Sequence, residues 1–97
     1  MNKAHPTEHF IVTIDGSVTT KDELFSRVTD TAYLGYSSFS GWDAFYDMLL
    51  VRLRASEIVI EVVNENLSGL SERDRDAYLE IMAEAAQEFP QKLLMRT

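Results

Sequence analysis

The chain has 97 residues, 45% of them hydrophobic, and it contains no cysteine. This length and composition allow one domain with a single core, and they exclude both a disulfide framework and a thiolate zinc site. Sixteen acidic residues against nine basic ones give a formal net charge of −7, which disfavours nucleic acid as a partner and favours a basic protein.

No targeting or membrane segment is recognisable in the sequence. Residues 1–9 lack the apolar region of a signal peptide, and no apolar run approaches the ~20 residues that a membrane span needs. We therefore expect a cytoplasmic protein with no membrane partner. We expect it to fold as a single domain over residues 1–97, with residues 1–9 as a mobile lead-in.

A strand, a helix and a loop are predicted in the first part of the chain. Residues 10–15 (FIVTID) are rich in β-branched side chains and are followed by Gly16, which predicts a strand and a turn. The pattern Thr20-x-x-Glu23 predicts the capped start of a helix. Residues 33–39 contain a glycine, two serines and three aromatic rings, and they predict a loop.

A central helix is predicted at residues 41–54, opened by the capping-box-like pattern Ser40-x-x-Asp43. Its apolar residues form two stripes, at Trp42, Phe45, Tyr46, Leu49 and Leu53 and at Ala44, Met48 and Val51. Asp43 lies where the helix dipole favours an acid, but Asp47 lies a turn further in and has no such explanation. We therefore expect a largely buried helix that leaves a narrow acidic seam at the surface.

Three further elements are predicted in the remainder of the chain. Residues 57–63 are almost entirely Ile and Val, which predicts a strand covered on both faces. Ser71-x-x-Asp74 opens a long helix that ends at Pro90, and residues 91–96 form a last short strand. The order β-α-α-β-α-β predicts an α/β fold in which a small parallel sheet has helices packed against it.

Acidic residues recur every four positions along the predicted last helix, at Glu72, Asp76, Glu80, Glu84 and Glu88. Because no basic residue lies between Asp76 and Gln91, Glu84 repels its acidic neighbours by about 0.2–0.5 kcal/mol per pair. Glu84 and Glu88 also lie at the helix end where the dipole favours cations. Either these carboxylates form a solvated face with a tolerated cost, or a basic partner offsets that cost on binding.

No enzyme motif is recognisable: there is no P-loop, no G-x-G-x-x-G and no G-x-S-x-G. His5 and His9 are separated by a proline and are not expected to bind a metal. We predict a protein that is not an enzyme and that binds no cofactor, metal or small-molecule substrate. A metal-dependent hydrolase using Asp43 and Asp47 is an alternative, although no third oxygen ligand lies nearby in the sequence.

Aromatic residues accompany the acidic seam. Tyr36 and Phe39 precede the central helix, and Tyr46 lies within it. Rigid rings beside carboxylates are typical of protein-binding hot spots, whereas the alternative for Phe39 is that it closes the core. We expect at least one of these three rings to be exposed.

Two segments carry a resemblance to a known family, namely WDAFYDML at residues 42–49 and the gapless stretch 70–97. In these segments the chain resembles the barstar family of intracellular ribonuclease inhibitors. The resemblance implies a two-layer fold with a three-stranded parallel sheet in the order 1-2-3. The loop at residues 36–41 departs from the family's Tyr-Gly-x-Asn run, and Tyr46 stands where the family often has Trp. The target is therefore open between a barnase-like enzyme and another toxin nuclease.

The resemblance also implies a function. In the family, the second helix and the loop before it plug the active site of a ribonuclease, and the residue matching Asp47 mimics a substrate phosphate. We therefore expect an immunity protein that forms a 1:1 complex with a basic ribonuclease toxin. The residues expected to bind the partner are Tyr36, Phe39, Asp43, Tyr46, Asp47, Glu84 and Glu88. The alternative is a regulatory module of the same fold with a non-nuclease partner.

Overall fold

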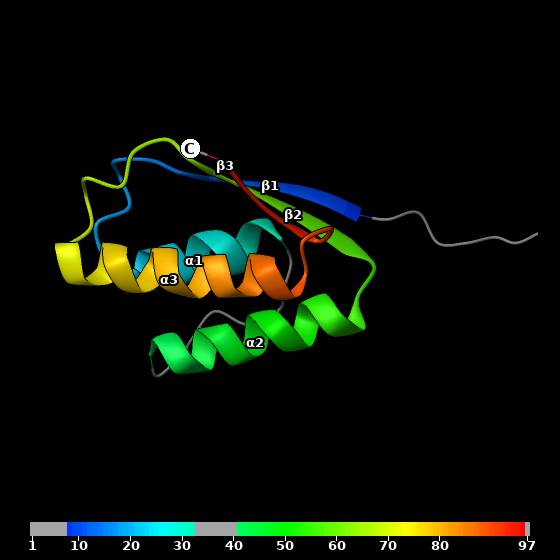
Figure 1. The fold of residues 1–97 in the computed structure, drawn as a ribbon. Helices are drawn as coiled ribbons and strands as arrows, with labels where there is room; N and C mark the ends of the chain where they lie inside the picture. The colour runs from blue at the N-terminus through cyan, green and yellow to red at the C-terminus, as the bar shows by residue number, and fades with distance from the viewer. Residues whose placement is uncertain (1–7, 33–40, 97) are drawn as a thin grey trace, which may run out of the picture.

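A computed structural model describes residues 8–32 and 41–96 of the protein, and Figure 1 shows their arrangement. The elements in chain order are β1 (Glu8–Ile14), α1 (Lys21–Thr31), α2 (Trp42–Ala55), β2 (Ile58–Asn64), α3 (Glu72–Glu88) and β3 (Leu93–Arg96). The predicted order β-α-α-β-α-β is therefore confirmed. The first strand begins two residues earlier than predicted, so Glu8 and His9 also pair with β2.

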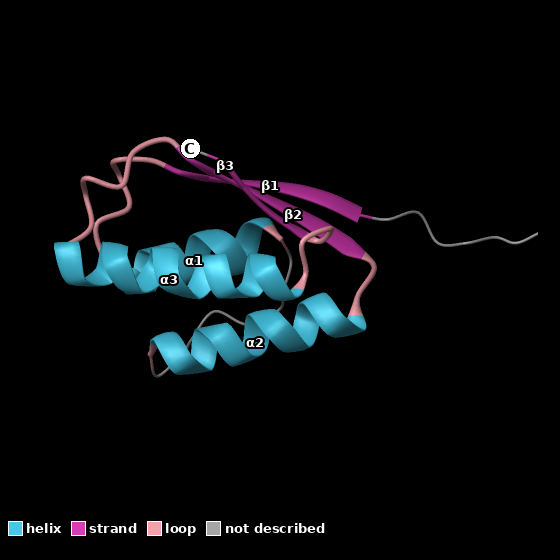
Figure 2. Ribbon diagram, in the orientation of Figure 1, coloured by secondary structure: helices cyan, strands magenta, loops and turns pink. Residues whose placement is uncertain are grey.

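The three strands form one parallel sheet in the order β1-β2-β3, as predicted. Figure 2 shows the three helices on the same side of this sheet. The prediction that the middle strand is covered on both faces is therefore wrong. Alternate residues of β2 are buried, whereas Val59, Glu61 and Val63 are half-buried on the open face. Glu61 is paired on that face, because it accepts a hydrogen bond from Arg96 and lies 3.4 Å from His9 Nε2.

The hydrophobic core lies between the sheet and the helices. The inward-facing side chains of the sheet, such as Ile14, Ile60 and Leu93, are almost fully buried. α1 packs against β1, α3 packs against β3, and α2 packs against α3. Figure 1 shows α2 farther from the sheet than the other two helices. The outermost helix is thus the one that carries the predicted acidic seam.

α2 is less buried than its composition predicts. One stripe of the helix, formed by Phe45, Leu49 and Leu53, is fully buried. Ala44 and Met48 are half-buried, and the side chain of Val51 is 57% exposed. Because α2 covers the other helices from outside, only one side of it faces the core. The expectation of a largely buried helix is therefore wrong for its second stripe.

Two of the three predicted helix caps are present. Thr20 Oγ1 accepts a hydrogen bond from the backbone N–H of Glu23, and Ser71 Oγ accepts one from Asp74. These side chains satisfy backbone donors that have no partner within the helix. The N-cap of α2 is Gly41, which makes no side-chain cap bond, so the helix begins one residue later than a Ser40 cap requires. Ser40 itself lies outside the described residues.

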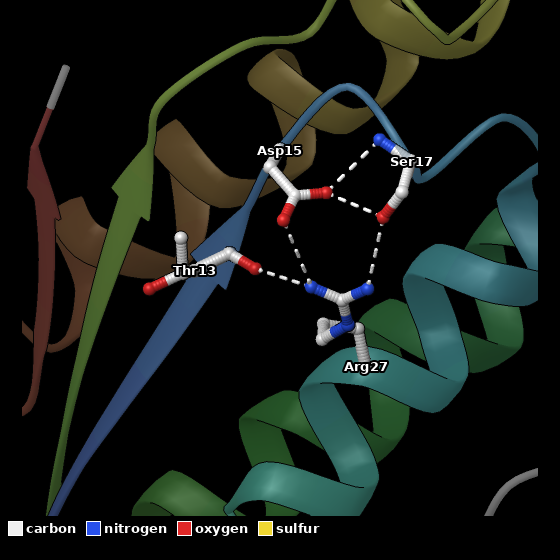
Figure 3. A network of polar contacts seen from close by, with 4 residues as sticks. All are labelled: Thr13, Asp15, Ser17 and Arg27. Carbon is white, nitrogen blue, oxygen red and sulfur yellow. Dashed lines mark hydrogen bonds and ion pairs between the residues drawn. The ribbon is translucent and has the colours of Figure 1, made fainter.

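A polar network joins α1 to the end of β1 (Figure 3). Arg27 Nη1 donates a hydrogen bond to the carbonyl oxygen of Thr13 at 2.9 Å and lies 3.9 Å from Asp15 Oδ2. The Ser17 hydroxyl and backbone N–H both donate to Asp15, and these bonds, with the nearby guanidinium, lower the pKa of that carboxyl. The network holds the first helix against the edge strand, so it supports the fold.

Candidate protein-binding surface

Four residues from α2 and α3 line a shallow depression of about 230 Å³, which we call the α2–α3 depression. They are Tyr46, Glu84, Gln87 and Glu88. Tyr46 comes from the half-buried side of α2, and the other three come from the last part of α3. The packing of α2 on α3 therefore brings together an aromatic ring and carboxylates that are distant in the sequence.

The electrostatic environment of Tyr46 reflects this arrangement. The pKa of its phenol is raised above the ordinary value, first because partial burial disfavours the phenolate. The second cause is the negative charge of Glu84, Glu88 and Asp47, in that order. Carboxylates from two helices thus act on one phenol.

Asp43 and Asp47 are exposed on α2, as are Glu84 and Glu88 on α3. Asp43 lies in the first turn of its helix, where the helix dipole favours an acid. The last turn of α3 contains no basic residue. None of these four carboxylates forms an ion pair with another residue in the described part of the chain. Within the described residues, no cation therefore compensates their charge at the surface.

The start of α2 is held by aromatic packing. Trp42 is half-buried and lies edge-on to Phe25 of α1, with ring centroids 5.0 Å apart. It also lies edge-on to Phe45 at 6.3 Å, and Phe45 in turn stacks on Phe25 at 4.6 Å. Because such ring pairs have preferred geometries, they orient the first turn of α2, which carries Asp43.

The predicted loop residues Tyr36 and Phe39 lie outside the described residues. Of the three rings expected near the seam, the structure therefore places Tyr46 alone, and it is half-buried. Sequence reasoning missed Gln87, which lines the depression between the two glutamates. Its spacing could have identified it: Gln87 lies three positions after Glu84, and residues three or four apart in a helix are neighbours on one face.

The described residues contain no group of three or more His, Cys, Asp or Glu side chains placed to hold a metal ion. A metal-dependent reaction at Asp43 and Asp47 therefore gains no support from the fold. Within the same residues, every helix is too short or too polar to cross a bilayer.

Comparison with known proteins matches the chain to a family model. The family model described as Barstar (barnase inhibitor) matches residues 9–95. This range includes the three helices and all of the three strands except Glu8 and Arg96. No curated protein and no solved structure matches the chain. The matched region contains both helices that line the α2–α3 depression.

Proposed function

This chain belongs to the barstar family, which is described as barnase inhibitors, and on that premise we propose that it is an immunity protein that blocks a ribonuclease toxin. The observation that carries the proposal is the α2–α3 depression, where Tyr46 of α2 lies beside the carboxylates of Glu84 and Glu88 of α3. A nuclease cleft that binds a phosphate backbone is basic, so an acidic surface with uncompensated charge is complementary to it. The complex has a 1:1 stoichiometry, because one such surface fills one cleft.

The proposed roles follow from the position of each group. Asp47 is exposed, follows Tyr46 on α2 and occupies the position of a substrate phosphate. Asp43 lies one turn earlier on the same helix and pairs with a Lys, Arg or His of the toxin. Tyr36 and Phe39, from the segment that precedes α2 in the sequence, supply further aromatic contact with the toxin.

The α2–α3 depression receives a basic side chain of the toxin. Glu84 and Glu88 provide carboxylate acceptors, and Tyr46 provides the face of an aromatic ring. Carboxylates beside a ring are the surroundings that suit a guanidinium or an ammonium group. The chain acts in the cytoplasm, where the RNA that such a toxin cleaves is found.

Rescue of cells that express a ribonuclease encoded next to this protein tests the proposal. We expect the protein to restore growth and to inhibit the purified enzyme, and we expect Asp47→Asn to lose both effects while keeping its circular dichroism spectrum. Glu65→Gln is the matched control, since it removes one exposed charge from the loop between β2 and α3. Equal protection by the wild-type protein and Asp47→Asn would contradict the assigned role. Inhibition of no ribonuclease, with capture of a different basic protein, would favour a regulatory module instead.

A further inference from the structure

Lys92 lies in the turn between α3 and β3, and its side chain reaches the C-terminal end of α2. Its Nζ donates hydrogen bonds to the carbonyl oxygens of Leu53 at 2.6 Å and Ser56 at 2.9 Å. These carbonyls lie in the last turn and at the C-cap of α2. The last carbonyl oxygens of a helix accept no hydrogen bond from the helix's own backbone, and the helix dipole favours a cation at that end. Lys92 therefore caps a helix from a distant part of the chain.

The backbone of Lys92 makes two further connections. Its carbonyl oxygen accepts a hydrogen bond from the N–H of Ile60 in β2 at 2.7 Å. Its own N–H donates to the carbonyl oxygen of Phe89, the C-cap residue of α3, at 3.0 Å. One residue thus joins the end of α2, the end of α3 and the central strand.

From these contacts we propose that Lys92 is a positioning residue that fixes α2 alongside α3, so that the acidic residues of both helices face one partner. α2 is the helix farthest from the sheet (Figure 1). Lys92 links its C-terminal end to the sheet, while Trp42 holds its first turn. The consequence for inhibition rests on the proposed function, but the positioning itself does not.

A general stabilising effect of positive charge at the end of α2 is the competing explanation. The last turn of α2 already contains two exposed basic residues, Arg52 and Arg54. Neither makes a side-chain hydrogen bond to another residue in the described part of the chain. Arg54→Met therefore removes a charge from this helix end and leaves both carbonyl contacts in place. Lys92→Met removes the same charge together with those contacts.

The phenol of Tyr46 reports the distance between the two helices, and it can be titrated by NMR with ¹³C-labelled tyrosine and no partner present. In Lys92→Met we expect the pKa of Tyr46 to fall toward its ordinary value, because α2 moves away from Glu84 and Glu88. Loss of a positive charge alone has the opposite sign, since it disfavours the phenolate, and Arg54→Met measures that effect. A Tyr46 pKa in Lys92→Met equal to or above that in Arg54→Met would overturn the proposal.

A second measurement at pH 7 covers the case in which Lys92→Met unfolds in alkali. We expect nuclear Overhauser effects between the Tyr46 ring and the Glu84 side chain to weaken in Lys92→Met and to persist in Arg54→Met. We also expect the protection of the Ser56 amide against hydrogen exchange to fall about tenfold or more. This is the effect expected for the loss of a hydrogen bond to a charged group. Unchanged Overhauser effects would overturn the proposal. Where Lys92→Met does not fold, Lys92→Gln is judged by the same criteria. Failure to bind any ribonuclease would remove the proposed function and leave these results standing.

Discussion

The phenol of Tyr46 on α2 and the carboxylate of Glu84 on α3 line the same depression, and after burial the charge of Glu84 is the largest cause of the raised pKa of that phenol. A negatively charged carboxylate therefore lies close to a phenol and disfavours its ionisation. Glu84 also has no basic partner in the described part of the chain. The free protein therefore keeps the repulsion between Glu84 and its acidic neighbours along α3, which a cation from outside can relieve.

Glu84→Gln is expected to change stability and binding in opposite directions. The substitution removes repulsion along α3 and an unfavourable interaction with its dipole, so the free energy of unfolding rises by about 0.3–1 kcal/mol. The same change weakens the complex with the ribonuclease, because one of its charge partners is lost. Urea unfolding tests the expected rise in stability. The dissociation constant of the complex, measured at one salt concentration, tests the expected loss of affinity. Glu65→Gln, which lies outside the surface, should leave affinity unchanged. A Glu84→Gln variant that is both less stable and equally tight in binding contradicts the interpretation.

The rate of association with the ribonuclease is expected to fall steeply as salt is added. A net charge of −7 attracts a basic enzyme over distances comparable to the Debye length, which shortens from about 30 Å at 0.01 M salt to about 10 Å at 0.1 M. Stopped-flow measurement of association between these concentrations tests the attraction, and the dissociation rate should change much less. A rate that is the same at both salt concentrations would show that charge does not guide the encounter.

Local signals in the sequence were sufficient to predict the order of the elements. The β-branched run in β1 and the caps at Thr20 and Ser71 depend on neighbouring residues, and these features are present in the structure. Apart from the start of α2, where Gly41 and not Ser40 is the N-cap, the errors concern burial. The Ile and Val residues of β2 reflect strand preference and do not reveal whether a second layer covers the sheet. Likewise, the apolar second stripe of α2, which includes Val51, does not reveal that this helix lies outermost.

The candidate surface was predictable only in part, for the same reason. The regular spacing of acids in α3 and the acidic residues of α2 are visible in each helix separately. That Tyr46 meets Glu84 and Glu88 depends on how two helices pack, which no local pattern specifies. Lys92 carries no local signal at all, because its side chain caps a helix that ends more than thirty positions earlier.

Stability is expected to fall above pH 10 because of Tyr78. Its side chain is fully buried, its hydroxyl donates a hydrogen bond to Asn64 Oδ1 at 2.6 Å, and burial raises its pKa well above the ordinary value. Below about pH 10 the phenol is neutral in both states, so its contribution to stability is fully present. Above that pH the unfolded chain ionises and the folded one does not, which lowers the free energy of unfolding by about 1.4 kcal/mol per pH unit.

Tyr78→Phe isolates this effect. The variant loses a buried hydrogen bond and should be less stable at pH 7 by about 1–3 kcal/mol, since Asn64 Oδ1 is left without its donor. Above about pH 10, the free energy of unfolding of Tyr78→Phe should decline less steeply than that of the wild-type protein. The difference is about 1.4 kcal/mol per pH unit, because one fewer group loses a proton on unfolding. Urea unfolding between pH 8 and pH 11 measures both slopes. Equal slopes would mean that Tyr78 ionises as readily in the folded protein as in the unfolded one.

Gly69→Ala is expected to lower stability without changing the affinity of the folded protein. A Cβ at Gly69 would lie 2.7 Å from the carbonyl oxygen of Val18 and 2.8 Å from that of Gly16, so backbone atoms of two loops would have to move apart. Such overpacking costs about 1–3 kcal/mol, and each kcal/mol lowers Tm by roughly 4–8 °C for a domain of this size.

Gly41→Ala is the comparison, because its Cβ would meet no atom within 4 Å and only the weaker N-cap preference is lost. The clash lies in the loops that follow β1 and β2, whereas the α2–α3 depression is formed by the last turns of α3 and the first half of α2. Thermal unfolding should therefore rank Gly69→Ala below Gly41→Ala, and inhibition below the melting temperature should be the same for Gly69→Ala and the wild-type protein. A large loss of affinity in Gly69→Ala at full folding would mean that these loops influence the binding helices, which the separate packing of the two regions does not predict.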